Sequence, residues 1–66
     1  MYKVVRIERI NDTVFRDDFK FDEREEAENV FTAESRKEHV VDVRLYYCIP
    51  YGGDKELVRF VRSAKE

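Results

Sequence analysis

The clearest helix signal in the chain is residues 22–38, which read DEREEAENVFTAESRKE. Asp22 is the expected N-cap, and Glu25 completes a capping-box-like pair three residues later. No Pro or Gly interrupts the stretch. Its apolar stripe is narrow and consists of Ala27, Val30 and Phe31 at i, i+3, i+4 spacing. A stripe this narrow cannot support a helix bundle, so we expect the helix to lie on a sheet that the flanking segments form.

Alternating apolar and polar residues flank the helix on both sides and predict four strands. The strands are expected at residues 2–10, 13–21, 40–49 and 57–62. Asn11-Asp12 and residues 50–54 are turn signals, and residues 63–66 are expected to be a frayed tail. The order β-β-α-β-β predicts an α+β, two-layer sandwich in which a four-stranded, mainly antiparallel sheet carries one helix on one face. Residues 1–66 form a single domain in this prediction.

The spacing of these elements is similar to that of β-grasp domains. That resemblance implies that the first and last strands pair in parallel at the centre of the sheet. An entirely antiparallel order is the alternative, because spacing alone does not choose between the two.

The register of the first hairpin depends on the length of its loop. A loop of about three residues pairs Val5 with Phe19 on the inner face and leaves Arg6 and Glu8 in water. A two-residue turn would instead direct Arg6 and Glu8 toward the core. We prefer the longer loop, because buried charges are costly.

Composition indicates a small protein from a reducing compartment. The chain has 66 residues, of which 42% are charged, and its net charge is −2. The single Cys48 cannot form an internal disulfide. No apolar run approaches the roughly 20 residues that a membrane span requires, and no signal-peptide pattern follows Met1. We therefore expect a cytoplasmic protein.

Nothing in the residue pattern predicts catalysis. His39 and Cys48 are the only histidine and cysteine, and no catalytic signature surrounds them. We expect His39 to mark the helix end and Cys48 to be a half-exposed strand residue. The acidic residues around Asp17 lack the spacing of a calcium loop, and Gly52-Gly53 lacks the pattern of a phosphate loop. The sequence predicts no enzyme, no metal and no cofactor.

The sheet face that the helix leaves open is the first candidate binding surface. Residues expected there are Val4, Ile10, Val14, Val40, Tyr46, Leu57 and Val61, together with Arg6, Arg44 and Arg59. Contiguous apolar patches mark interfaces, and Tyr and Arg are enriched at binding hot spots. The predicted contacts to a partner, or to a second copy in a homodimer, are Arg6, Arg44, Tyr46 and Arg59. The alternative is that these side chains lie flat against their cross-strand neighbours.

The start of the helix is the second candidate surface. Residues 17–28 contain seven acidic and two basic residues, a local net charge of −5. One interpretation is a solvated helix start that compensates the helix dipole. The other is an acidic corner that mimics phosphates and binds a basic groove on a partner, through Asp17, Asp18, Glu23 and Glu26.

Two further expectations concern polar residues. Aromatic and basic side chains interleave as they do in single-strand nucleic-acid binders, at Arg44, Tyr46, Tyr47, Tyr51, Lys55 and Arg59. The net negative charge of the chain argues against that function. Glu34 extends the apolar stripe of the helix and should face the sheet, where it either overhangs the edge or pairs with Lys37 or a strand arginine.

The runs FDEREEAE (residues 21–28) and VDVRLY (residues 41–46) resemble short proteins of bacteriophages and mobile elements, including small anti-CRISPR proteins. This resemblance implies a non-enzymatic protein that occupies the surface of another macromolecule. The function we expect is a small protein-binding domain, of the kind that phages encode to inhibit a host defence complex in the host cytoplasm. The alternatives are a nucleic-acid-binding module and a structural homodimer.

Overall fold

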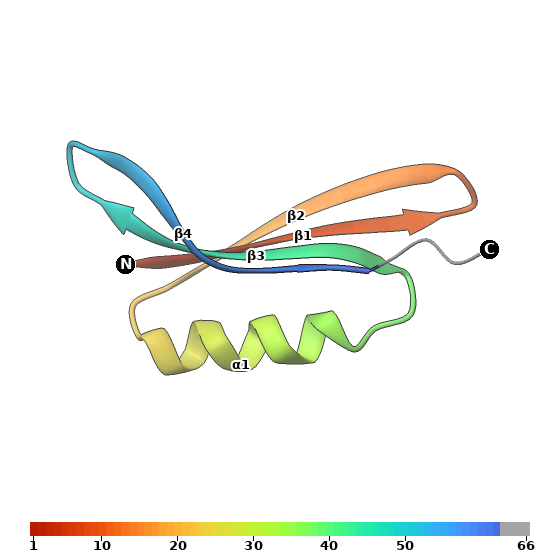
Figure 1. The fold of residues 1–66 in the computed structure, drawn as a ribbon, viewed down its shortest axis with the longest axis horizontal. Coiled ribbons are helices and arrows are strands. Elements are labelled where there is room, and N and C mark those ends of the chain that lie inside the picture. The colour runs from red at the N-terminus through yellow and green to blue at the C-terminus, as the bar shows by residue number, and fades with distance from the viewer. Residues whose placement is uncertain (63–66) are drawn as a thin grey trace.

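The structure, a computed structural model, describes residues 1–62, so the prediction for residues 63–66 lies outside the described residues. Its elements are the strands β1 (Tyr2–Ile10), β2 (Thr13–Phe21), β3 (Val40–Ile49) and β4 (Gly53–Val61) and the helix α1 (Arg24–Ser35). The helix lies between β2 and β3 in sequence and covers one face of the sheet (Figure 1). The predicted α+β fold class and the order β-β-α-β-β are confirmed.

The boundaries of two elements, α1 and β4, differ from the prediction. The N-cap of α1 is Glu23 rather than Asp22, and its side chain makes no capping hydrogen bond. The helix ends at Ser35, because the next two N–H groups bond only three residues back. β4 begins at Gly53 rather than residue 57, since the turn before it occupies only residues 50–52. Among residues 1–62, no helix is both long and apolar enough to cross a membrane.

The sheet is antiparallel throughout and has the strand order β2-β1-β3-β4. The central parallel pair that a β-grasp domain would have is therefore wrong for this chain. β3 has more apolar residues than β4 and lies beside β1 in the centre, where both of its edges are paired. The charge-rich β4 lies at one edge, as charged strands commonly do.

The first hairpin turns on Asn11-Asp12 alone. Both residues have positive φ, 52° and 68°, which is the backbone of a type I′ turn, and both residue types tolerate it. Ile10 therefore faces Thr13, and Arg6 lies on the helix side of β1. The three-residue loop that we preferred is wrong, because this turn matches the twist of the strands and shifts the register by one residue.

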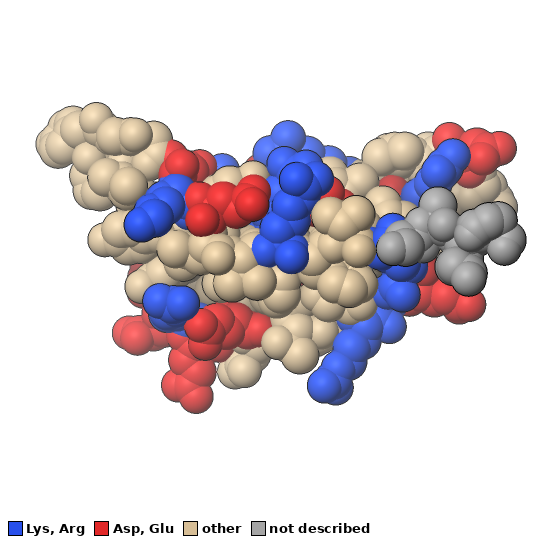
Figure 2. Space-filling view, viewed as in Figure 1, with Lys and Arg blue, Asp and Glu red and all other residues tan. Residues whose placement is uncertain are grey.

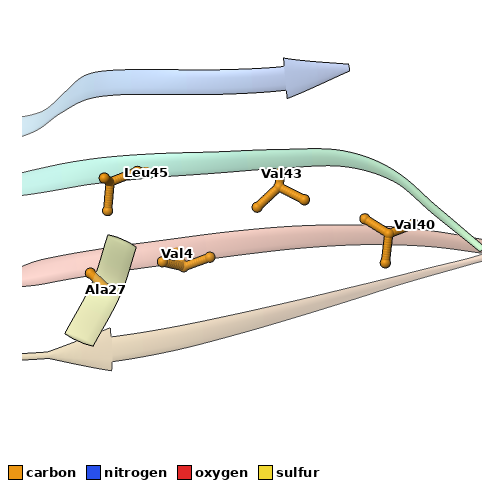
Figure 3. Close-up of a cluster of buried hydrophobic side chains, with 5 residues drawn as sticks. All are labelled: Val4, Ala27, Val40, Val43 and Leu45. Atoms are coloured by element: carbon orange, nitrogen blue, oxygen red, sulfur yellow. The ribbon is translucent and has the colours of Figure 1, made fainter. Parts of the chain in front are cut away.

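The core between helix and sheet is small. Its fully buried members are Val4, Ala27, Val40, Val43 and Leu45 (Figure 3). A bulge opposite Ile7 and Glu8 inserts one extra residue in β3, so that Val40 lies on the same side as Val43. A chain of this length has too little apolar surface for a larger core.

Arg62 fastens the end of β4 to the segment that follows the helix. Its guanidinium donates to the carbonyl oxygens of Ser35, Lys37 and Val40 at 2.9–3.0 Å and lies over the ring of Phe60. Carbonyls at a helix C-terminus lack intrahelical donors, and a basic side chain commonly satisfies them. Arg62 thus holds α1, β3 and β4 together at one end of the molecule.

Candidate protein-binding surface

Neither a substrate pocket nor a metal centre is present in the described part of the chain. No cavity is found there, and no group of three or more His, Cys, Asp or Glu side chains converges as metal ligands would. His39 precedes β3 and Cys48 is near its far end, nine residues on. A strand rises about 3.3 Å per residue, so the two side chains are roughly 30 Å apart and cannot act as a pair.

The largest correction to the predicted sites concerns Arg6. The shifted hairpin register places Arg6 under the helix, where it bonds Glu34 at 2.8 Å and also pairs with Asp17. Only 16% of the Arg6 side chain and 11% of the Glu34 side chain are exposed. Lys37 also donates to Glu34, at 2.9 Å. Arg6 is therefore a structural residue of the helix–sheet interface and is unavailable to a partner.

The charge on Glu34 is stabilised by these contacts. Burial alone would raise the pKa of its carboxyl group, but hydrogen bonds from Arg6 and Lys37 outweigh burial, so the pKa lies below the ordinary value. The prediction that Glu34 faces the sheet and pairs with Lys37 or a strand arginine is confirmed. An ionised carboxylate paired in this way contributes to stability rather than to binding.

The open face of the sheet differs from the predicted apolar patch. Four residues expected there lie on the helix side instead, namely Val4, Ile10, Val40 and Leu57. Val14 and Val61 remain exposed on the open face, together with Arg44, Tyr46 and Arg59. Bulges in β3 and β4 moved Val40 and Leu57, and the two-residue turn moved Val4 and Ile10.

The charged side chains of the open face bond mainly to one another. Asp42 accepts hydrogen bonds from Arg44 and Arg59 at 3.1–3.2 Å. Burial raises the pKa of Asp42, but these two arginines outweigh burial and keep the pKa below its ordinary value. Lys3 pairs with Asp54 at 2.7 Å and lies 5.2 Å from the ring centre of Tyr46. The alternative interpretation, in which these side chains lie against their neighbours, describes most of this face.

Residues of the predicted acidic corner point in different directions. Asp17 lies on the helix side of β2, where it pairs with Arg6, whereas Asp18 lies on the open face and pairs with Arg16. Glu23 and Glu26 are exposed at the start of α1. The structure therefore does not gather the four residues into one surface, because adjacent residues of a strand alternate between its faces.

The aromatic and basic residues of the nucleic-acid interpretation are also divided. Arg44, Tyr46 and Arg59 lie on the open face, while Tyr47 and Lys55 face each other on the opposite side. Tyr51 is at the tip of the second hairpin. Tyr46 is the only aromatic among the six on the open face, and its ring is already approached by Lys3. This arrangement offers no row of stacking platforms.

Four of the exposed large apolar residues lie on the hairpin of β3 and β4, whereas Met1, Val14, Phe15 and Val61 are exposed at other places on the molecule. We define the hairpin surface as Tyr47, Ile49, Tyr51 and Val58, which are 38%, 40%, 108% and 42% exposed. The hairpin extends past the start of α1 and curves away from it (Figure 1), so the helix cannot cover this end. Figure 2 shows uncharged atoms at its tip, whereas blue and red side chains are interspersed with uncharged ones over the rest of the molecule in this view. The ring of Tyr47 packs beside the ring of its cross-strand neighbour Tyr2, at 5.3 Å between centroids.

Tyr51 has an unusual backbone conformation. Its φ is +65°, in the left-handed region that a bulky L-residue rarely adopts. The N–H of Gly52 donates to the carbonyl oxygen of Ile49 at 3.1 Å and closes the turn around Pro50 and Tyr51. Turns with positive φ at this position normally have Gly or Asn there. The chain thus has a strained tyrosine in full contact with solvent where a glycine would fit better.

Sequence reasoning missed this surface. Tyr47 and Ile49 alternate with Tyr46 and Cys48, and this alternation places Tyr47 and Ile49 on the helix side correctly. It does not show that the hairpin extends past the start of the helix. The only signal was Tyr51 between Pro50 and Gly52, at the tip of a predicted turn. Comparisons with protein-family models, with curated proteins and with solved structures gave no match.

Proposed function

We propose that this chain is a small, non-enzymatic protein-binding domain that contacts its partner through the hairpin surface. The observation that carries the proposal is the fully exposed, strained Tyr51, next to the exposed apolar residues of the same hairpin. Strained residues persist where the conformation serves a function, and tyrosine is enriched at binding hot spots. The internally paired open face has fewer free groups to offer a partner.

The resemblance to small bacteriophage proteins supports a narrower version of this proposal. In it, the partner is a host defence complex in the cytoplasm, and the domain inhibits the complex by occupying its surface. An apolar contact through the hairpin would tolerate high salt, whereas a phosphate-mimicking contact through Glu23 and Glu26 would weaken, because salt screens exposed charges. The salt dependence of binding therefore separates the two surfaces.

The test compares one apolar-to-charged substitution on the hairpin with a matched substitution elsewhere. Ile49→Lys places a charge within the hairpin surface, and Val14→Lys places the same charge on an exposed apolar residue of β2. Affinity capture from host lysate at low and high salt, followed by affinity measurement with the purified partner, is the readout. We expect Ile49→Lys to weaken binding by about tenfold or more and Val14→Lys to leave it unchanged.

The opposite pattern would identify another surface. If Ile49→Lys binds normally while Glu23→Lys with Glu26→Lys abolishes binding, the acidic start of α1 is the contact and the hairpin proposal is wrong. Unfolding curves for every variant show whether a loss of binding reflects a loss of fold.

A further inference from the structure

One edge of the sheet, formed by β4, is unpaired along Gly53–Val61 and is incompletely covered by the helix. α1 packs chiefly on β3 and β1, and Val58 of β4 is 42% exposed. Leu57 and Phe60 are only half-buried. An unpaired edge with exposed apolar residues is a template for pairing with another strand.

The bulge in β4 decides which side chains share a face along this edge. Glu56 faces Tyr46 and Val58 faces Leu45, so Leu57 is the extra residue. Leu57 packs against the core, which puts it on the helix side together with Val58. Glu56 and Arg59 both lie on the open face, because each is opposite an open-face residue of β3. Before the bulge the even-numbered residues of β4 lie on the open face, and after it the odd-numbered residues do.

We propose that β4 pairs antiparallel with β4 of a second copy of the chain, around a two-fold axis between Leu57 and Val58. Residues directly opposite in an antiparallel pair must share a face. Pairing Leu57 with Val58 of the second copy satisfies this rule across the bulge and sets Glu56 opposite Arg59, Lys55 opposite Phe60 and Asp54 opposite Val61. The Glu56–Arg59 pair occurs twice by symmetry. Glu56 is exposed and makes no ion pair within residues 1–62.

The other edge, formed by β2, has a like-charge pair at the centre of its self-pairing register, although that register also sets Arg16 opposite Asp18. β2 pairs with β1 without a bulge, so its alternation is regular along Thr13–Phe21. The register that would align all nine residues of two β2 strands sets Asp17 against Asp17, and like charges directly opposite are unfavourable. Charges of this kind protect an edge from self-pairing. We therefore place the second copy at β4, where it would cover Val58 but leave Tyr51 at the tip of the hairpin free for a different partner.

Charge reversal and exchange test the proposed register. Sedimentation velocity of the full chain, from micromolar to millimolar concentration, should show a dimer. Glu56→Arg and Arg59→Glu should each weaken it by about tenfold or more, because each places two like-charge pairs at the axis. The double exchange should restore the dimer, and Lys20→Glu on the β2 edge should leave it intact.

Two results would overturn the proposal: a wild-type chain that is monomeric at millimolar concentration, or a double exchange that unfolds like the wild type yet dimerises as weakly as the single reversals. Arg59 also bonds Asp42, so Arg59→Glu has a risk of misfolding that the exchange does not remove. Amide hydrogen exchange of wild-type β4 avoids that risk. Protection of β4 that rises with concentration supports the pairing, and protection independent of concentration contradicts it. The hairpin test above does not depend on either outcome.

Discussion

Arg6 and Glu34 show how a single pair of residues links the register of a hairpin to the packing of the helix on the sheet. Arg6 bonds Glu34 and Asp17 and lies 3.8 Å from Glu8, so one guanidinium meets three carboxylates. Burying charges is costly unless they are paired, and here burial and pairing occur together. Removing the charge of Arg6 or of Glu34 should leave the charge of the other residue buried with fewer partners of opposite charge.

Glu34→Gln should lower the free energy of unfolding by about 1–3 kcal/mol at neutral pH, since it removes a charged hydrogen-bond acceptor from Arg6 and Lys37. Because the folded-state pKa of Glu34 is lowered, its stabilising effect is complete above the ordinary glutamate pKa and disappears as pH falls through the lowered value. Urea unfolding of both proteins from pH 7 down to pH 3 measures this. A difference in stability that does not shrink on acidification would show that the charge of Glu34 is unimportant.

At the residue scale, the sequence predicts the face on which some side chains lie and fails to predict it for others, for a physical reason. The orientation of Glu34 toward the sheet could be predicted, because an error in where a helix begins or ends does not change which residues share a face of the helix. Arg6 could not, because a shift of one residue in a hairpin exchanges the two faces of the strand. The turn residues Asn11 and Asp12 favour the shorter loop, and the bond to Glu34 lowers the cost of burying Arg6 that otherwise argues against it.

At the scale of elements, strand limits followed closely from alternation, and strand pairing did not. β1, β2 and β3 have the predicted bounds, since turn residues mark where they end. The bulges in β3 and β4 leave no such mark, although they decide where Val40 and Leu57 lie. Strand order depends on which strand shields the most apolar surface beside β1, a property of the assembled sheet rather than of any segment.

Arg62→Ala should destabilise the junction between α1, β3 and β4 by about 1–2 kcal/mol, because three carbonyl groups lose their donor. Arg62→Lys is the matched control, which keeps the charge but cannot reach all three oxygens. Amide exchange should speed up for residues near Ser35 and Val40 in the alanine variant and less so in the lysine variant. Unchanged exchange at that end would mean that Arg62 is dispensable.

On the scale of the whole molecule, the two faces of the sheet differ in the interactions that their side chains make. The helix-bearing face holds the small core, and the open face is a network of ion pairs such as Arg44–Asp42 and Lys3–Asp54. Val14, Phe15 and Val61 are exposed at separate places on the sheet, whereas Tyr47, Ile49 and Tyr51 are exposed on the hairpin of β3 and β4, which extends beyond the start of the helix (Figure 1). The position of this hairpin could not be predicted from the sequence, because it depends on where the helix begins relative to the sheet.

Tyr51→Gly tests most directly whether the hairpin surface is functional, because stability and binding should change in opposite directions. Glycine relieves the positive φ of residue 51, so the free energy of unfolding should rise by about 0.5–1 kcal/mol. Affinity for the purified partner should fall by about tenfold or more, since the fully exposed tyrosine ring is lost. Both quantities are measured on the same preparation, by urea unfolding and by titration. A variant that is more stable and binds as tightly as the wild type would contradict a binding role for this hairpin.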